Sequence, residues 1–92
     1  MKSEPIILTS DPLDEADFDV SGRAMERALR ARLVRRTRLA LGLSQAAFAQ
    51  RFHVPVGTLR DWEQARATPP DFAIAYMRVI ARHPELVIEA TA

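Results

Sequence analysis

Residues 41–64 read LGLSQAAFAQRFHVPVGTLRDWEQ and contain the clearest structural signals of the chain. Gly42 suits the position just after a helix end, where glycine adopts a left-handed conformation without strain. Ser44 is a good N-cap, because its hydroxyl can accept a hydrogen bond from a free N–H of the first turn. The stretch therefore predicts a short helix over residues 45–52 that follows the end of an earlier helix.

A second short helix is predicted over residues 55–64. Pro55 suits its first turn, because the N–H that proline lacks is not needed there. Leu59 and Trp62 are three residues apart and so share one buried face. Only His53 and Val54 lie between the two helices. The stretch therefore predicts two short helices joined by a tight turn.

The flanking sequence is helical as well. Residues 24–41 contain neither glycine nor proline, and their apolar residues recur at helical spacing. Residues 71–82 show the same period, and residues 85–89 allow one last turn after a proline. The chain is therefore predicted to be all-α, with four to five helices. The expected core comprises Phe48, Phe52, Leu59, Tyr76 and Ile80.

Charge divides the chain into two parts. Residues 1–22 hold one base and six acids, a balance of −5, whereas residues 23–92 hold twelve arginines and six acids, a balance of +6. We therefore expect a flexible acidic arm over 1–22, with a boundary near Gly22, and a basic domain over 23–92. A basic body of this kind favours nucleic acid as a partner, and the arm is a candidate for binding a protein.

Composition excludes several other classes. The chain of 92 residues has no cysteine, and its two histidines lie thirty residues apart, so no metal site or cofactor is expected. The sequence shows no phosphate loop and no nucleophile–base pair, so we expect no enzyme. No apolar run approaches the ~18 residues that span a bilayer. We expect a cytoplasmic protein without membrane contact.

Residues 41–49 resemble the start of a Cro/repressor-type (XRE) helix-turn-helix, and residues 54–64 resemble its recognition helix. Pro69 and residues 76–84 are similar to a subgroup, the HigA-like antitoxins. The resemblance covers roughly residues 30–88. It implies a lambda-repressor-like fold that binds double-stranded DNA and regulates transcription.

Four residues of the second short helix are expected to contact bases, because a helical wheel places them on or beside its exposed face. Arg60 can bind guanine O6 and N7 with both arms of its guanidinium, and Asp61 can accept from cytosine N4 or hold Arg60 in place. Val56 can contact a thymine methyl, and Gly57 lets the backbone approach a base edge. The alternative is that Arg60 and Asp61 are simply solvated.

Phosphate contacts are implied mainly by the resemblance. Gln45 begins the first short helix, where free amides and the helix dipole favour an anion, and the matching glutamine of the family contacts the DNA backbone. Otherwise Gln45 is an ordinary exposed residue at a helix start. Matching position adds four further phosphate candidates: Thr58, Gln64, Arg66 and Thr68.

The resemblance also implies a structural salt bridge between Arg38 and Glu63, which a reading of the residues alone would place on the surface. His53 departs from the family, which normally has glycine there because φ tends to be positive; histidine tolerates that conformation at some cost. Trp62 is expected in the core rather than as a platform for stacking bases.

One such unit covers half of an operator, so we expect a homodimer on a pseudo-palindromic operator. Apolar residues left over near the C-terminus are the dimer candidates: Phe72, Val79, Leu86, Val87 and Ile88. The alternative is that these residues close the core of the monomer.

The acidic arm would be repelled by DNA but carries apolar anchors that can fold onto a partner. The resemblance and the charge together predict an antitoxin of a toxin–antitoxin system, which neutralises a small basic RelE-fold ribonuclease toxin and acts as repressor of its own operon. The toxin-binding candidates are Ile6, Ile7, Leu8, Leu13 and Phe18. Two alternatives are a stand-alone phage-like repressor without a toxin and an interaction domain that has lost DNA binding.

Overall fold

The computed structural model describes the backbone of residues 14–92 and the side chains of residues 22–92. This part of the chain consists of helices and short connections, so the predicted all-α class is confirmed. Its five helices are α1 (Asp14–Ala40), α2 (Gln45–Phe52), α3 (Val56–Glu63), α4 (Asp71–Arg82) and α5 (Pro84–Ala90).

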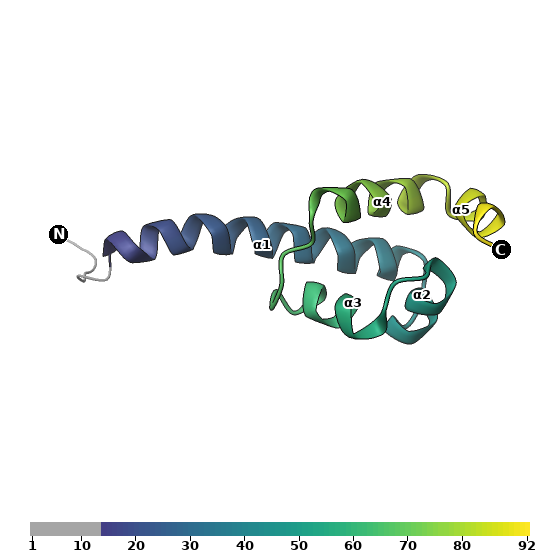
Figure 1. The fold of residues 1–92 in the computed structure, drawn as a ribbon, viewed down its shortest axis with the longest axis horizontal. Helices are drawn as coiled ribbons and strands as arrows, with labels where there is room; N and C mark the ends of the chain where they lie inside the picture. Colours follow the sequence, from purple (N-terminus) through teal and green to yellow (C-terminus); the bar gives the residue numbers. More distant parts are fainter. Residues whose placement is uncertain (1–13) are drawn as a thin grey trace.

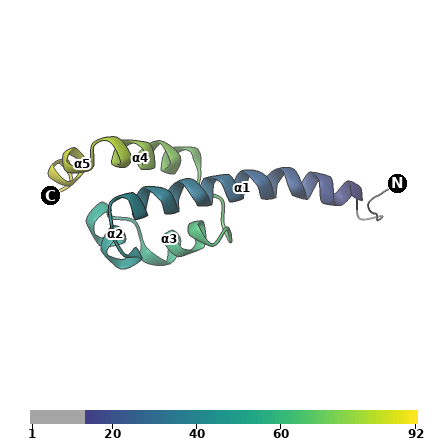
Figure 2. The same cartoon turned by 180° about the vertical axis from the view of Figure 1, so that it is seen from behind.

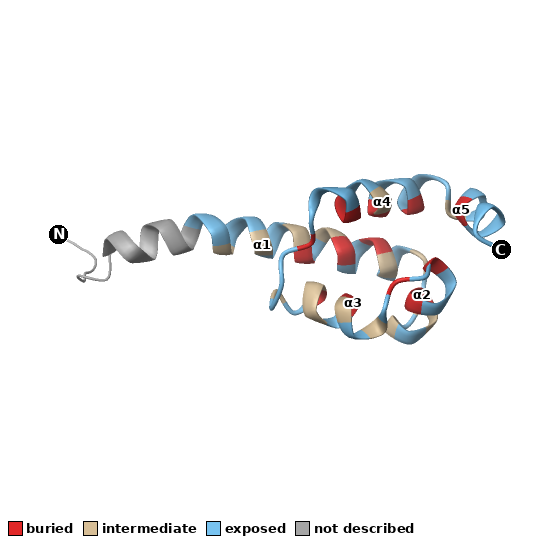
Figure 3. Cartoon of the chain, viewed as in Figure 1, coloured by how far each residue is buried: buried red, intermediate tan, exposed pale blue. Residues whose placement is uncertain are grey.

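The long helix α1 organises the fold. Its second half lies between α4 on one side and α2 with α3 on the other, as both views of the ribbon show (Figures 1 and 2). Its first half extends beyond the other helices. Buried residues gather where the second half of α1 meets α3 and α4 (Figure 3). The packed body is therefore built around the end of α1 that leads directly into α2.

The core is apolar and contains the predicted residues Phe48, Phe52, Leu59 and Ile80, all buried. The rings of the two phenylalanines are 4.8 Å apart, and burying one such side chain contributes about 1.5–3 kcal/mol. Tyr76 is only partly buried, and its Oη donates a hydrogen bond of 2.7 Å to the Phe52 carbonyl oxygen. Trp62 packs against this core at its edge, as expected for a structural tryptophan.

The predicted start of α2 is confirmed atom by atom. Gly42 has φ +69°, its N–H donates to the Leu39 carbonyl (3.0 Å), and the Leu43 N–H donates to the Arg38 carbonyl (3.4 Å). This pair of bonds is a Schellman motif, which satisfies carbonyls at the end of α1. Ser44 Oγ then accepts from the Ala47 N–H (3.1 Å) and caps α2.

Helix α1 begins at Asp14, eight residues earlier than the boundary expected at Gly22. One glycine costs a helix only about 1 kcal/mol relative to alanine, and acidic residues are favoured near a helix N-terminus. Gly22 is therefore an interior position of α1. Among residues 22–40 of α1, whose side chains the structure describes, Ala31, Val34 and Thr37 are buried, and Met25 and Leu29 are exposed.

Val87 was expected at a dimer interface but is a core residue, only 7 % exposed. Helix α5 packs against α2 and α4, and this side chain faces them. For Val87 the structure thus supports the alternative, closure of the monomer core. The other four dimer candidates remain exposed: Phe72, Val79, Leu86 and Ile88.

Between residues 14 and 92, no helix combines the length and apolar composition that a bilayer crossing requires.

Candidate nucleic-acid interface

The turn between α2 and α3 centres on His53, which has φ 61° and ψ 39°. The positive φ expected at this position is confirmed. The following N–H, that of Val54, donates to the Ala49 carbonyl at 3.0 Å. This bond folds the chain back sharply at the end of α2. Histidine thus occupies the left-handed position of the turn at some cost in strain.

Helix α3 shows Gly57 and Arg60 to solvent, while Leu59 between them is fully buried. Val56 and Asp61 are partly buried at the flanks. A Cβ atom built on Gly57 would meet nothing within 4 Å, so the space beside this backbone is open. The four residues expected to contact bases therefore lie on or beside one accessible face.

The loop after α3 brings Arg66 close to Asp61. The Arg66 N–H donates to the Asp61 carbonyl at 2.8 Å, and its Nη1 lies 3.8 Å from Asp61 Oδ1. Ala65 between them has φ 58°, a left-handed position that no sequence signal indicated. An exposed ion pair of this length contributes ~1 kcal/mol or less. Asp61 thus contacts Arg66 and not Arg60, the alternative partner that the sequence suggests.

The phosphate candidates of α3 and its loop differ in accessibility. Gln64 and Thr68 are exposed, as is Arg66, whereas Thr58 is partly buried. Gln64 is the C-terminal cap of α3 and Thr68 precedes the buried Pro69. Gln64, Arg66 and Thr68 therefore lie at and beyond the C-terminal end of α3, whereas Thr58 lies in its first turn and Gln45 lies at the start of α2.

Arg38 and Glu63 form the predicted ion pair, and it is almost fully buried. Arg38 Nε donates to Glu63 Oε2 at 2.7 Å and Nη2 donates to Oε1 at 2.8 Å. The third nitrogen, Nη1, donates to the Leu43 carbonyl at 2.9 Å. Arg38 therefore ties the end of α1 both to the end of α3 and to the residue before the cap of α2.

The electrostatics of this pair follow from its geometry. Burial disfavours the charged form of Glu63, but hydrogen bonds from Arg38 and Gln45, together with the arginine charge, outweigh it and hold the pKa of Glu63 below its usual range. The hydrogen bond to Glu63 raises the pKa of Arg38. Both groups therefore stay ionised at neutral pH.

Sequence reasoning missed two interactions of this pair, one with Gln45 and one with Arg35. Gln45 Nε2 donates to Glu63 Oε1 at 3.1 Å, which links the first residue of α2 to the buried pair. The charge of the exposed Arg35 also lowers the pKa of Glu63. Arg35 precedes Arg38 by three residues, a spacing that puts two side chains on neighbouring parts of a helix surface. That spacing was the available signal.

Comparison with known proteins places this geometry in a family. Over 43 residues the chain is 37 % identical to antitoxin HigA-2 of Vibrio cholerae serotype O1 (strain ATCC 39315 / El Tor Inaba N16961). The match covers 47 % of this chain and 41 % of that protein, so it spans less than half the length of the relative. No solved structure matches the chain. A family model described as a helix-turn-helix domain matches residues 28–89, and the chain therefore belongs to the helix-turn-helix domain family.

Proposed function

We propose that this protein is a sequence-specific DNA-binding antitoxin that neutralises a small ribonuclease toxin and represses its own operon. The observation that carries the DNA-binding part is the accessible face of α3, with Arg60 projecting from a short helix whose end is anchored by the buried Arg38–Glu63 pair. A recognition helix of this kind reads base edges from the major groove.

Base reading rests on α3. Arg60 is exposed and free to bind guanine O6 and N7 with two hydrogen bonds, which discriminates against a wrong base by roughly 1–3 kcal/mol. The open space beside Gly57 lets the α3 backbone approach a base edge closely. Val56 contacts a thymine methyl at the flank, and Asp61 accepts from cytosine N4.

Phosphate contacts hold the protein in register without reading sequence. Gln45 binds a phosphate at the N-terminus of α2, where the dipole of the helix favours an anion. The remaining contacts come from the first turn of α3 and from the segment that follows this helix: Thr58, Gln64, Arg66 and Thr68. Each neutralised phosphate releases counterions, so binding must weaken steeply with salt.

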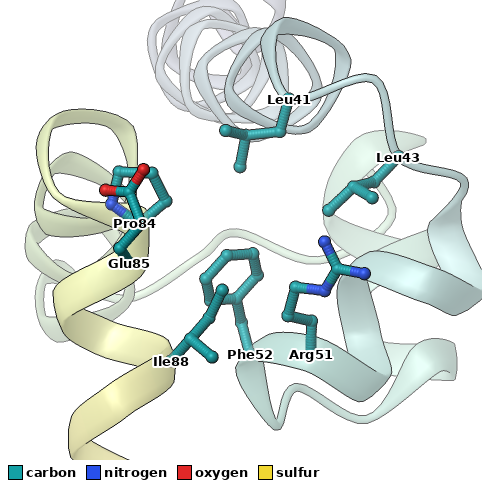
Figure 4. Close-up of a pocket in the computed structure, with 7 residues that line it drawn as sticks. All are labelled: Leu41, Leu43, Arg51, Phe52, Pro84, Glu85 and Ile88. Carbon is teal, nitrogen blue, oxygen red and sulfur yellow. The ribbon is translucent and has the colours of Figure 1, made fainter.

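A homodimer would place two such units on a two-fold operator. Two exposed apolar residues of α5, Leu86 (61 % exposed) and Ile88, support an interface at this end of the molecule. Ile88 also lines an open pocket of about 220 Å³. Figure 4 shows Leu41, Phe52 and Ile88 pointing into it. Phe72 and Val79 on α4 enlarge the exposed apolar surface.

The toxin would bind the acidic N-terminal segment. Ile6, Ile7, Leu8 and Leu13 lie outside the described residues, and only the backbone of Phe18 is described. Support comes from the balance of −5 in residues 1–22, which suits a small basic partner, and from the similarity of the chain to antitoxin HigA-2.

A repressor that has no toxin is the second candidate. The helix-turn-helix match begins at residue 28 and so leaves the acidic segment outside it. In this case the basic domain (residues 23–92) binds an operator in the same way, and the acidic segment does not inhibit a ribonuclease.

Two experiments test the proposal. Selection from a randomised duplex library, followed by titration at several salt concentrations, should return one pseudo-palindromic sequence and a slope of log K on log salt of about −0.9 per phosphate contact. A flat salt response would remove the DNA-binding claim and favour an interaction domain.

Purification of the tagged full chain from its native host, with mass spectrometry of bound proteins, tests the toxin. A stoichiometric small basic protein is expected, and its ribonuclease activity should be inhibited by the full chain. Recovery of DNA without such a protein would leave the repressor that has no toxin.

A further inference from the structure

The side chain of Gln45 is not free at the start of α2, because it is bound to a buried carboxylate. Glu63 Oε1 accepts both from Gln45 Nε2 (3.1 Å) and from Arg38 Nη2 (2.8 Å). The other oxygen, Oε2, accepts from Arg38 Nε (2.7 Å). The side chain of Glu63 is only 3 % exposed. No other hydrogen bond of the Gln45 side chain is present within the described part of the chain.

We propose that Glu63 is a positioning residue for the phosphate contact of Gln45, an inference that rests on the DNA-binding function proposed above. An amide nitrogen carries two hydrogens in one plane, about 120° apart. When one of them is held by Glu63, the direction of the other is set before DNA arrives. The rotamer freedom of Gln45 is then lost on folding rather than on binding, which favours affinity.

The carboxylate also decides which way round the amide of Gln45 sits. An ionised carboxylate only accepts hydrogen bonds, and Glu63 stays ionised because its pKa is held low. The amide must therefore turn Nε2, not Oε1, towards Glu63. The remaining N–H of Nε2 is a donor, which is what a phosphate oxygen requires.

Arg38 makes this arrangement compatible with a phosphate. A lone carboxylate behind Gln45 would repel the DNA backbone, but the arginine neutralises it through two short hydrogen bonds. Arg38 also donates to the Leu43 carbonyl (2.9 Å), two residues before Gln45. The same ion pair therefore holds both the amide of Gln45 and the backbone from which it projects.

A double-mutant cycle tests the proposal. The wild type, Gln45→Ala, Glu63→Gln and the double variant are titrated with a fluorescent random-sequence DNA duplex at low salt, each folded by circular dichroism. Gln45→Ala is expected to bind roughly tenfold more weakly, the loss of one charge-assisted hydrogen bond. On its own, Glu63→Gln should weaken DNA binding by most of that factor. When added to Gln45→Ala, it should cause no further loss of affinity.

Arg66→Ala is the matched control, because Arg66 is a phosphate candidate whose side chain contacts Asp61 and not Glu63. In a variant that carries both Arg66→Ala and Glu63→Gln, the two fold-losses in DNA affinity should multiply. If the losses of Gln45→Ala and Glu63→Gln also multiply, Glu63 has only a structural role and the inference is wrong. If Arg66→Ala weakens binding but Gln45→Ala does not, the inference fails while DNA binding stands. If the wild type binds no duplex, the proposed function itself fails.

A measurement on the wild type covers the case in which Glu63→Gln does not fold. In NMR spectra, one Nε2 proton of Gln45 should exchange slowly with water, both in the free protein and in the DNA complex. The exposed side chain of Gln50 serves as the reference for an unbound amide. Exchange of both Gln45 protons as fast as those of Gln50 would overturn the inference.

Discussion

Arg30 Nη1 donates a hydrogen bond of 2.8 Å to the carbonyl oxygen of Pro69, thirty-nine residues later in the chain. Its Nη2 lies 2.8 Å from Asp71 Oδ1. Pro69 is fully buried between α3 and α4, so the arginine satisfies a carbonyl at the point where the chain crosses from the α3 side of α1 to the α4 side. This contact fixes the loop that carries Arg66.

Arg30→Ala is expected to lower the free energy of unfolding by about 1–3 kcal/mol, because the Pro69 carbonyl loses a charged donor. Urea denaturation followed by circular dichroism measures it. Asp71→Ala is the matched control: its side chain is 94 % exposed, so we expect a loss of ~1 kcal/mol or less. Equal losses in the two variants would assign the effect to the exposed ion pair instead.

Glu63→Gln should destabilise the fold by about 3–5 kcal/mol at neutral pH, since it leaves the buried Arg38 charge uncompensated. The low pKa of folded Glu63 adds a pH dependence. The contribution of ionised Glu63 to the free energy of unfolding is complete above the pKa of glutamate in the unfolded chain, about 4.3. It is lost as the pH falls through the pKa of Glu63 in the folded protein. Urea titrations at several pH values should therefore show the difference between wild type and variant shrinking in acid. A constant difference would contradict the lowered pKa.

His53→Gly is expected to stabilise the protein by up to about 1 kcal/mol, because glycine removes the cost of a left-handed φ of 61°. Thermal unfolding measures the change. Gln50→Gly, inside α2, is the opposing control and should cost about 1 kcal/mol. A loss of stability in His53→Gly would mean that the histidine side chain stabilises the turn by more than the strain it causes.

Arg60→Ala should reduce the preference for the specific duplex over the random duplex, because it loses roughly 1–3 kcal/mol of base discrimination. Gln45→Ala should instead weaken binding to both duplexes by the same factor, as a phosphate contact does. Competition titrations with the selected operator and a random duplex separate the two patterns. Equal losses on both duplexes for Arg60→Ala would assign Arg60 to the phosphates.

Arg35→Ala is expected to weaken binding to every sequence and to make the dependence of log K on log salt less steep than in the wild type. The reason is its position: the charge of Arg35 acts on Glu63, which is bound to Gln45. Arg36→Ala is the control, because Arg36 is also an exposed arginine but projects from α1 in a direction about 100° away around the helix axis. Identical salt slopes for the two variants would show that only net charge matters.

Features that depend on near neighbours in the chain were predictable. Local preferences of single residues account for three of them: the end of α1 just before Gly42, the cap of α2 at Ser44 and the positive φ at His53. The exposed face of α3 follows from helical periodicity alone. The Arg38–Glu63 pair required the family resemblance, because nothing in the local sequence of either residue indicates burial.

The all-α class, the two short helices with their tight turn, and the side chains on the accessible face of α3 all follow from the amino-acid sequence. The burial of Val87, the contact of Asp61 with Arg66 and the hydrogen bond of Gln45 to Glu63 follow only from the way the helices pack. The physical reason is range. Caps, turns and periodicity act over three or four residues, whereas burial and side-chain partners depend on which helices meet after the chain has folded.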